Sequence, residues 1–309
     1  MGTPEFAVPC LRELLRTEEV AAVFTKPDKP KGRGNKMQPS PVKVFAQSHN
    51  IPVYEPRSLK SGEDAEKAYE LLKNIAPDLI IVAAYGQILP EWILELPALS
   101  PKCINLHGSL LPKYRGAAPI ERAVMEGETE TGITAMVMAK GVDTGDMLLT
   151  EKTLIGIDET AFELRQRLSE IAAKTMLKTL DILKSGSLKR DIQIETDATF
   201  APMIDKGLSL INFSDLSDTV HNVIRAVSGY GFLDGKRLKL FRTHKTNIPV
   251  KDGKPGQLIS DNGLYINCGD YRLQILELQP EGGKRIKADD FLRGHKITSE
   301  SVLRREQNE

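Results

Sequence analysis

Residues 103–112 read Cys-Ile-Asn-Leu-His-Gly-Ser-Leu-Leu-Pro, a short apolar run followed by a glycine and a turn-forming segment. A run of this length predicts a buried strand over residues 103–107. Because alternate side chains of a strand point to opposite faces, Asn105 and His107 share one face, and the apolar residues between them face the other way. In a parallel α/β sheet this polar pair would lie at the carboxyl edge of the strands, where such sheets bind ligands.

The sequence on either side of this strand alternates between strand and helix patterns. Short apolar runs predict further buried strands at residues 20–25, 51–54, 78–84 and 134–138. Helical patterns fall at residues 41–47, 65–75 and 117–125, and in a long amphipathic stretch between Asp158 and Gly186. We therefore expect an α/β fold: a doubly wound, mostly parallel, Rossmann-like sheet with helices on both faces.

The pattern changes after residue 186. Residues 187–202 are polar and weakly periodic, which is typical of an exposed linker. A helix is then predicted near residues 216–227, followed by short strands at 237–242, 257–259, 264–268 and 271–278 that are separated by Asp-Gly, Asn-Gly and Gly-Gly turns. This spacing predicts a small antiparallel β-barrel of the OB-like type. The expected organisation is a catalytic domain over residues 1–186, a linker over 187–202 and the barrel over 203–309.

The composition fits a globular chain of about two domains. Lysine plus arginine and aspartate plus glutamate are equal at 42 each, which argues against a strongly basic nucleic-acid binder. Residues 204–309 nevertheless carry 17 basic against 14 acidic side chains, a difference of +3, the sign expected of a domain that contacts a phosphate backbone. No apolar run approaches the roughly 20 residues of a membrane helix. The first residues lack the basic and apolar regions of a secretory signal, so we expect a cytoplasmic protein.

The cysteines and the possible nucleophiles of the sequence argue against several kinds of site. Cys10, Cys103 and Cys268 are far apart and match neither a zinc-site spacing nor a disulfide framework. We expect three buried free thiols and no metal. No serine or cysteine with an adjacent base is evident in the sequence, which disfavours a covalent acyl-enzyme.

A carboxylate follows the predicted strand at residues 134–138, in Lys-Gly-Val-Asp-Thr-Gly-Asp over residues 140–146. Its two glycines permit a tight loop that brings Asp143 back towards His107. Each polar residue alone has a plainer interpretation: a lone strand histidine is more often structural, an asparagine a cap and an aspartate between glycines a turn former. Together with Asn105 they fit acyl transfer to an amine. The amide stabilises an oxyanion, the imidazole takes a proton, and the carboxylate fixes the imidazole tautomer or orders a water.

The segment from Asn105 to Asp146 resembles the signature of the folate-dependent formyltransferase family. The likeness lies in Asn-x-His, then Ser-Leu-Leu-Pro-x-Tyr-Arg-Gly, then a downstream Asp-Thr-Gly. The resemblance implies direct transfer of a formyl group from the co-substrate 10-formyltetrahydrofolate to an amine, without a metal. It implies Asn105, His107 and Asp143 as the catalytic residues, and Ser109, Leu110, Leu111 and Pro112 as contacts to the folate.

A basic, glycine- and proline-rich loop over residues 26–36 bears on the acceptor. The plain interpretation is a flexible solvated loop. The loop also resembles the tRNA-contacting insertion of those family members that formylate methionine on charged initiator tRNA. On that resemblance Lys31, Arg33 and Lys36 contact the tRNA, and the Arg33 guanidinium suits bidentate contact with a phosphate.

The second domain offers another basic surface. In a regular strand over residues 237–245, Arg237, Lys239, Phe241 and Lys245 would share one face. A charged outer face is usually only solvated, but a basic sheet that bears aromatic rings is also how small barrels bind a nucleic-acid backbone. We therefore expect Arg237 and Lys239 to contact the tRNA.

One departure from the family concerns the first strand. Members usually carry a short apolar strand before Gly-Thr-Pro, and Met1 stands where that strand would end. This strand would be central in the sheet, so we expect its absence to leave two strand edges unpaired and to lower the stability of the chain.

Other classes of protein share parts of this pattern. A dehydrogenase would share the fold class, but no Gly-x-Gly-x-x-Gly opens a helix after a strand. A non-catalytic RNA-binding protein would leave Asn105, His107 and Asp143 without a role. Within the family, a formyl-folate hydrolase or a formyltransferase for a sugar or nucleotide amine stays open. We expect a monomer that makes no membrane contact.

Overall fold

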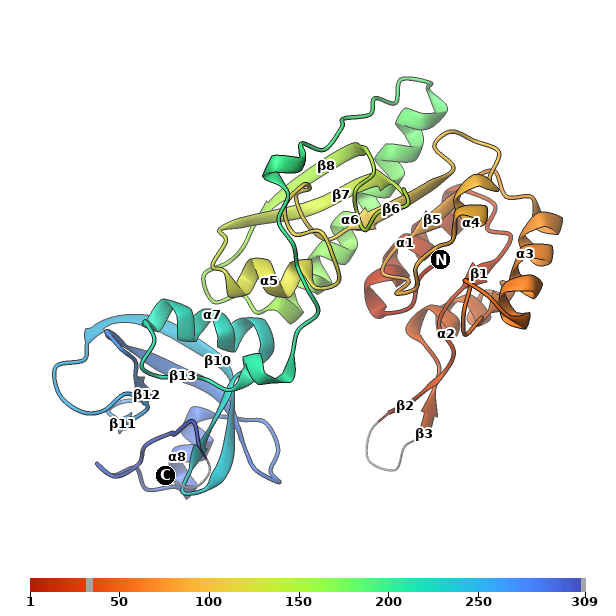
Figure 1. Ribbon diagram of the computed structural model, residues 1–309. Coiled ribbons are helices and arrows are strands. Elements are labelled where there is room, and N and C mark those ends of the chain that lie inside the picture. Colours follow the sequence, from red (N-terminus) through yellow and green to blue (C-terminus); the bar gives the residue numbers. More distant parts are fainter. Residues whose placement is uncertain (32–35, 307–309) are drawn as a thin grey trace. The chain divides into compact units, whose positions relative to one another are not determined.

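The computed structural model describes residues 1–31 and 36–306 (Figure 1). Contacts divide the chain into two compact units. Unit 1 comprises residues 1–116, 131–153 and 165–201, and unit 2 comprises residues 117–130, 154–164 and 202–309. Two segments that the sequence places within the first domain, 117–130 and 154–164, therefore have most of their contacts in unit 2.

Unit 1 is built around short strands and longer helices. Its strands are β1 (Val23–Phe24), β4 (Val53–Tyr54), β5 (Ile80–Val82), β6 (Cys103–His107), β7 (Glu130–Val137) and β8 (Met147–Leu154), with a separate hairpin of β2 (Lys29–Lys31) and β3 (Lys36–Gln38). Its helices are α1 (Val8–Thr17), α2 (Pro41–Ser48), α3 (Glu63–Ile75), α4 (Glu91–Glu95) and most of α6 (Ala161–Lys184), with 3-10 turns at Glu5–Ala7 and Glu195–Asp197. The helix predicted at residues 41–47 begins as expected, because the Ser40 hydroxyl accepts a hydrogen bond from the Lys43 backbone N–H at 3.1 Å.

The sheet of unit 1 is in two pieces. β1 and β4 form a parallel pair, and the second piece has the order β5-β6-β7-β8. β5 and β6 are parallel, whereas β6 and β7 are antiparallel. The prediction of a mostly parallel sheet is therefore correct for β1–β4 and β5–β6 and wrong for β6–β7. An apolar run reports that a strand is buried but not which way it points.

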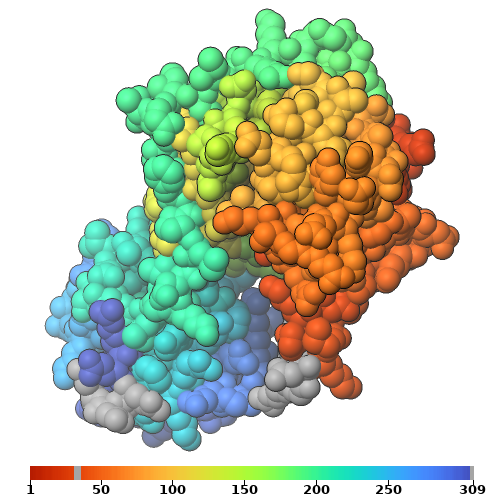
Figure 2. Space-filling view, turned by 45° about the vertical axis from the view of Figure 1, so that its right-hand side comes forward, coloured from red at the N-terminus to blue at the C-terminus, as the bar shows by residue number. Residues whose placement is uncertain are grey.

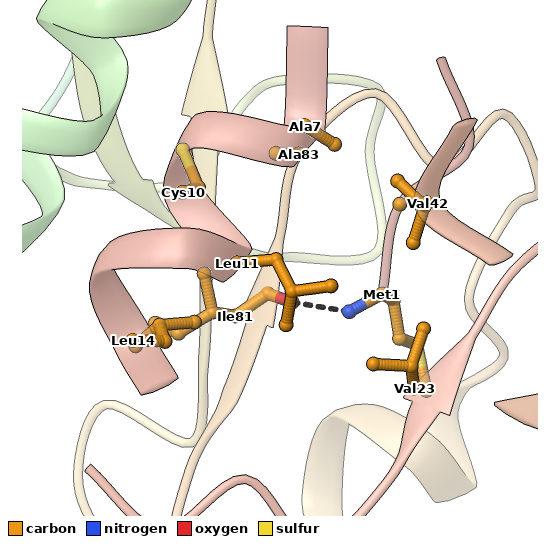
Figure 3. A pocket seen from close by; sticks show the side chains of 10 residues that line it. Met1, Ala7, Cys10, Leu11, Leu14, Val23, Val42, Ile81 and Ala83 are labelled. Carbon is orange, nitrogen blue, oxygen red and sulfur yellow. Dashed lines mark hydrogen bonds between the residues drawn. The ribbon is translucent and has the colours of Figure 1, made fainter. Parts of the chain in front are cut away.

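Helices cover both faces of this sheet, as β5 shows. Ile80 and Val82 belong to a buried cluster that includes Leu72 of α3 and Ile93 of α4. Ile81, between them, lies against Leu11 of α1 (Figure 3). Because successive strand residues point to opposite faces, α1 and the α3–α4 pair lie on opposite sides. The doubly wound arrangement is confirmed.

The first two residues link the two pieces of the sheet. The Gly2 N–H donates to the Phe24 carbonyl and the Ala83 N–H donates to the Met1 carbonyl, both at 3.0 Å. The Met1 amino group donates to the Ile81 carbonyl at 2.7 Å (Figure 3). A cleft of about 950 Å³, lined by Met1, residues 18–24 and residues 75–81 among others, adjoins this link. Met1 and Gly2 therefore bridge β1 to β5 and the residue that follows it.

Residues 187–202, predicted as an exposed linker, are exposed along most of their length (green in Figure 2). They are nevertheless bound to unit 1 at several points. Asp191 forms a bridge with Met147, and Phe200 forms one with Arg115. Gln193 and Ala201 are buried. The segment is therefore a strap fixed to unit 1, and it is called the strap below.

Unit 2 is a curled antiparallel sheet with helices packed on it. Its strands are β9 (Tyr230–Leu233), β10 (Lys236–Pro249), β11 (Leu258–Ser260), β12 (Leu264–Asn267), β13 (Tyr271–Pro280) and β14 (Ile286–Lys287), in the order β11-β12-β13-β10-β9 with β14 on β13. Its helices are α5 (Pro119–Met125), α7 (Ser217–Val227) and α8 (Ala288–Gly294), with a 3-10 turn at Lys206–Ser209. Arg304 forms a bridge with Phe232 of β9, and Val302 forms one with Gln257 beside β11. One C-terminal segment thus contacts both ends of the sheet.

Candidate active site

The three polar residues predicted to meet do come together in unit 1. β6 presents Asn105 and His107 on one face, and the loop between β7 and β8 brings Asp143 to them. The Asn105 Nδ2 lies 3.5 Å from Asp143 Oδ1, and the His107 Nδ1 lies 3.5 Å from Asp143 Oδ2. An amide, an imidazole and a carboxylate therefore surround one point at the end of β6.

The His107 ring is held in a defined tautomer. Its Nε2 lies 2.9 Å from the carbonyl oxygen of Tyr114. A carbonyl only accepts, so in the neutral ring Nε2 carries the hydrogen and Nδ1 has the free lone pair. Of the two roles considered for Asp143, fixing the tautomer thus belongs to Tyr114. The ring is 6% exposed, and Nδ1 is the nitrogen that faces Asp143.

The Asp143 carboxylate is oriented by one strong hydrogen bond. The Gly116 N–H donates to Oδ2 at 2.9 Å. Asp143 itself has a φ of 52°, in the left-handed region that non-glycine residues seldom adopt. Gly145 allows the tight loop that this requires, because a Cβ there would lie 1.9 Å from the Val137 carbonyl oxygen. The loop conformation is therefore closely specified.

The turn after β6 is cross-linked to β7. The Ser109 hydroxyl donates to the Lys113 carbonyl at 2.6 Å, so it is used within the turn. Thr134 of β7 donates to the Ser109 carbonyl at 2.7 Å and accepts from the Leu111 N–H at 3.2 Å. Ser109 and Leu111 are buried, while Leu110 and Pro112 are half-buried. Of the four residues predicted to contact folate, the latter two have the side chains more open to a ligand.

Sequence reasoning missed residues that hold this site in place. Tyr114 lies inside the signature but acts through its carbonyl, which no side-chain pattern reports. Thr134 gives a signal that could have been used, because a polar residue inside a buried strand needs a partner. Gln193 lies in the strap, and its contact with the Asp143 loop spans 50 residues of sequence.

The basic residues predicted to contact tRNA fall in both units. In unit 1, Lys31 and Lys36 are opposite each other in the β2–β3 hairpin, and Arg33 lies outside the described residues. In unit 2, the Arg237 guanidinium lies over the Tyr230 ring at 5.7 Å from its centroid. The Lys239 Nζ and the Arg285 guanidinium lie over the Phe241 ring at 5.1 and 4.5 Å from its centroid. Partial burial and the Arg237 charge lower the pKa of Lys239.

The prediction that Lys245 shares this face is wrong. Leu238 and Leu240 of β10 are buried, but the next buried residue is Thr243 rather than 242. The pairing of β10 with β13 shifts register on either side of Arg242, as at a β-bulge. Such a shift moves every later side chain to the other face, and Lys245 accordingly forms an ion pair with Asp218 of α7 at 2.7 Å.

The predicted free thiols are confirmed. Cys10, Cys103 and Cys268 are unpaired and buried, and burial raises the pKa of each thiol to about 12. In residues 1–31 and 36–306, no cluster of three or more histidine, cysteine, aspartate or glutamate side chains is placed to hold a metal ion. No helix within these ranges is long and apolar enough to cross a membrane.

Comparisons with solved structures support this fold. A sugar 3N-formyltransferase with dTDP and 5-N-formyl-THF has a TM-score of 0.66 at 21% identity, over 89% of this chain and 95% of that one. The N-formyltransferase from Helicobacter canadensis with folinic acid and dTDP-3-aminofucose has a TM-score of 0.62 at 19% identity, over 89% of this chain and 97% of that one. At these identities the likeness concerns the fold alone.

Comparisons of sequence show the family. Residues 2–180 match the formyl transferase family model, and residues 203–296 match that of the formyl transferase C-terminal domain. A methionyl-tRNA formyltransferase of Geobacter sulfurreducens is 45% identical, over 96% of this chain and 93% of that protein. A methionyl-tRNA formyltransferase of Geobacter metallireducens is 46% identical, over 96% of this chain and 95% of that protein. The chain belongs to the formyl transferase family, in its methionyl-tRNA formyltransferase branch.

Proposed function

We propose that this protein transfers the formyl group of 10-formyltetrahydrofolate to the amino group of methionine carried by initiator tRNA, for translation initiation. The likeness to methionyl-tRNA formyltransferases along nearly the whole chain supports this acceptor. The meeting of Asn105, His107 and Asp143 in one place is the observation that carries the chemistry.

Asn105, His107 and Asp143 divide the work of a direct transfer. The His107 Nδ1 takes a proton from the methionyl ammonium, and the freed amine attacks the formyl carbon. The new C–N bond gives a tetrahedral intermediate, whose oxyanion accepts a hydrogen bond from the Asn105 amide. The bond from the formyl carbon to N10 of the folate then breaks and His107 returns its proton to N10, while the new amide nitrogen, which gained a positive charge on attack, releases its extra proton to water. Asp143 stabilises the imidazolium while it carries that proton.

A covalent intermediate on the protein is not needed. The three thiols are buried with raised pKa values, so they are poor nucleophiles. The Ser109 hydroxyl, which lies beside the site in sequence, already donates to the Lys113 carbonyl. Ser109, Leu110, Leu111 and Pro112 instead form a turn that we assign to folate contact.

Two groups of basic side chains are assigned to contact with the tRNA. Lys31 and Lys36 belong to the β2–β3 hairpin, Arg33 lies between them in the sequence, and Arg237 and Lys239 belong to the outer face of β10. Arg237 and Lys239 lie over aromatic rings, and neither forms an ion pair with a carboxylate within residues 1–31 and 36–306. Such unpaired cations are available to phosphates.

The proposal extends to the domains of the chain, its oligomeric state and its location. We assign residues 1–186 to the catalytic domain, 187–202 to the linker and 203–309 to the tRNA-binding domain. The bridges of Val302 and Arg304 to opposite ends of the curled sheet support closure into an OB-like barrel. The enzyme acts as a monomer in the cytoplasm, where charged tRNA is used.

One assay tests the acceptor. The protein is incubated with 10-formyltetrahydrofolate and, separately, with methionyl initiator tRNA, glycinamide ribonucleotide, a nucleotide-linked amino sugar, or buffer alone. Formyl-methionyl-tRNA is the expected product, with little formate released in buffer. Formylation of the ribonucleotide or the sugar alone would overturn the proposal, as would rapid release of formate without an acceptor.

A further inference from the structure

The strap reaches into the candidate active site through one side chain, Gln193. This residue is 8% exposed, although its neighbours on both sides are exposed. Its Nε2 donates to the Asp143 carbonyl at 2.8 Å and to the Gly145 carbonyl at 2.7 Å. Both amide hydrogens are therefore used on the backbone of the loop that carries Asp143.

Gln193 is itself anchored by Arg115. The Arg115 Nε donates to Gln193 Oε1 at 3.0 Å, and the Arg115 guanidinium pairs with the Glu195 carboxylate at 2.9 Å. Arg115 is 2% exposed, and its backbone is paired with the strap through Thr199 and Ala201 at 2.8 and 2.7 Å. The Gln193 amide thus has a fixed position from which to hold the loop.

These bonds close a ring around Asp143. From the Asp143 carbonyl the ring passes through Gln193 to Arg115, then along the backbone to Gly116, whose N–H binds the Asp143 carboxylate. The main chain of Asp143 and its carboxylate are therefore fixed by the same assembly. This matters because the 3.5 Å separations from Asn105 and His107 are too long to hold the carboxylate in place.

We infer that Gln193 is a positioning residue for formyl transfer, which holds Asp143 at the working distance from His107 and Asn105. The inference rests on the proposed catalytic role of Asp143. Gln193 contacts only the backbone of the loop in the hydrogen bonds described, so it acts through Asp143 and not on the substrate. A misplacement of about 1 Å at a catalytic group can cost about 100-fold in rate.

The first test replaces the amide by an apolar side chain of similar length. In Gln193→Met we expect kcat with methionyl-tRNA to fall about 10- to 100-fold, while KM for tRNA and folate changes less than about threefold. The matched control is Gln166→Met, the same substitution at an exposed position of α6, which should retain the wild-type kcat. Rates are expressed per folate-binding site, titrated with 5-formyltetrahydrofolate, so that a loss of folded protein does not count as a loss of turnover.

A double-mutant cycle separates positioning from simple support of the fold. If Gln193 acts through Asp143, adding Gln193→Met to Asp143→Asn should change kcat less than about twofold, whereas a structural defect would multiply the two losses. Gln193→Glu, which keeps the shape and removes both donors, serves as a second variant if the methionine variant does not fold.

The outcomes are distinguishable from failure of the proposed site. Wild-type kcat in the Gln193 variants, or equal losses in both backgrounds, would overturn the positioning role. Wild-type kcat in Asp143→Asn would instead overturn the catalytic assignment of the aspartate, and the positioning role with it.

Discussion

His107 of unit 1 and His221 of unit 2 occupy similar surroundings. Both are buried, both donate from Nε2 to a backbone carbonyl at 2.9 Å, and both lie 3.5 Å from an aspartate. They differ at Nδ1. In His221 this nitrogen accepts from the Thr243 hydroxyl at 2.8 Å, whereas in His107 it faces Asp143 at 3.5 Å, with no closer partner in the described part of the chain.

The comparison separates structural from reactive polar groups. Burial and a nearby carboxylate are common to both rings. These two features are therefore not enough to make a histidine a general base. What distinguishes His107 is a nitrogen whose lone pair is still available to a substrate proton. The same distinction applies to Lys245, which is paired with Asp218, and Lys239, which has no carboxylate partner in residues 1–31 and 36–306.

The largest effect is expected from removing the imidazole of His107, whose Nδ1 lone pair is available. His107→Ala should lower kcat about 1000-fold with KM for tRNA changed less than threefold, because a general base contributes to the transition state and little to binding. In the matched variant His221→Ala, kcat per active site should stay near wild type while the melting temperature falls. Similar losses of turnover in the two variants would break the comparison.

A second test concerns the amino group of Met1, a residue that lines the cleft of about 950 Å³. Burial lowers the pKa of the Met1 ammonium to about 6 from its ordinary value near 8. As the pH falls from 8 to 6, the unfolded chain binds this proton and the folded chain does not, so the chain loses up to about 3 kcal/mol of stability.

An added strand should remove this pH dependence. Extending the chain upstream by about six β-branched residues, the length of an ordinary strand, would move the charge out of the cleft and pair the open edges. We expect a higher melting temperature, with a larger gain at pH 6 than at pH 8.5. If the extended and the original chain have equal melting temperatures at pH 6 and also at pH 8.5, such a strand does not enter the cleft.

Arg237 and Lys239 of β10, which have no carboxylate partner in residues 1–31 and 36–306, should matter for tRNA binding rather than for turnover. Replacing Arg237 and Lys239 together by alanine should raise KM for tRNA about tenfold and make binding less sensitive to salt, with kcat nearly unchanged. Lys245→Ala, on the other face of the same strand, is the control. If this control weakens tRNA use as much as the double variant, the assignment of the face is wrong.

The smallest effect concerns the satisfied histidine. Burial, together with the nearby Arg225 and Lys245 charges, outweighs the Ile157 carbonyl and Asp158 and lowers the pKa of His221. Below pH 6.5 the unfolded chain binds a proton that the folded chain resists, so unit 2 loses stability as the pH falls. The melting temperature should drop by a few degrees more between pH 7.5 and 5.5 in the wild type than in His221→Gln. An identical drop would remove His221 as the cause.

Much of the fold could be predicted because its signals are local. The bounds of β6 were predicted correctly because an apolar run meets Gly108, and the start of α2 because Ser40 caps it and Pro41 opens it. The direction of β7 and the bulge beside Arg242 could not be, because pairing partners decide both. The burial of Gln193 and its contact with the Asp143 loop could not be predicted for the same reason, because nothing in a polar segment indicates which of its polar residues has a distant partner.

The strap has a consequence for dividing the protein. Truncation after α6, at residue 186, looks natural from sequence, yet it would remove Gln193 and the strand-like partners of Arg115. A fragment that ends after Ala201 keeps both. Unit 1 therefore extends to residue 201, fifteen residues past the boundary at 186 that the sequence indicates.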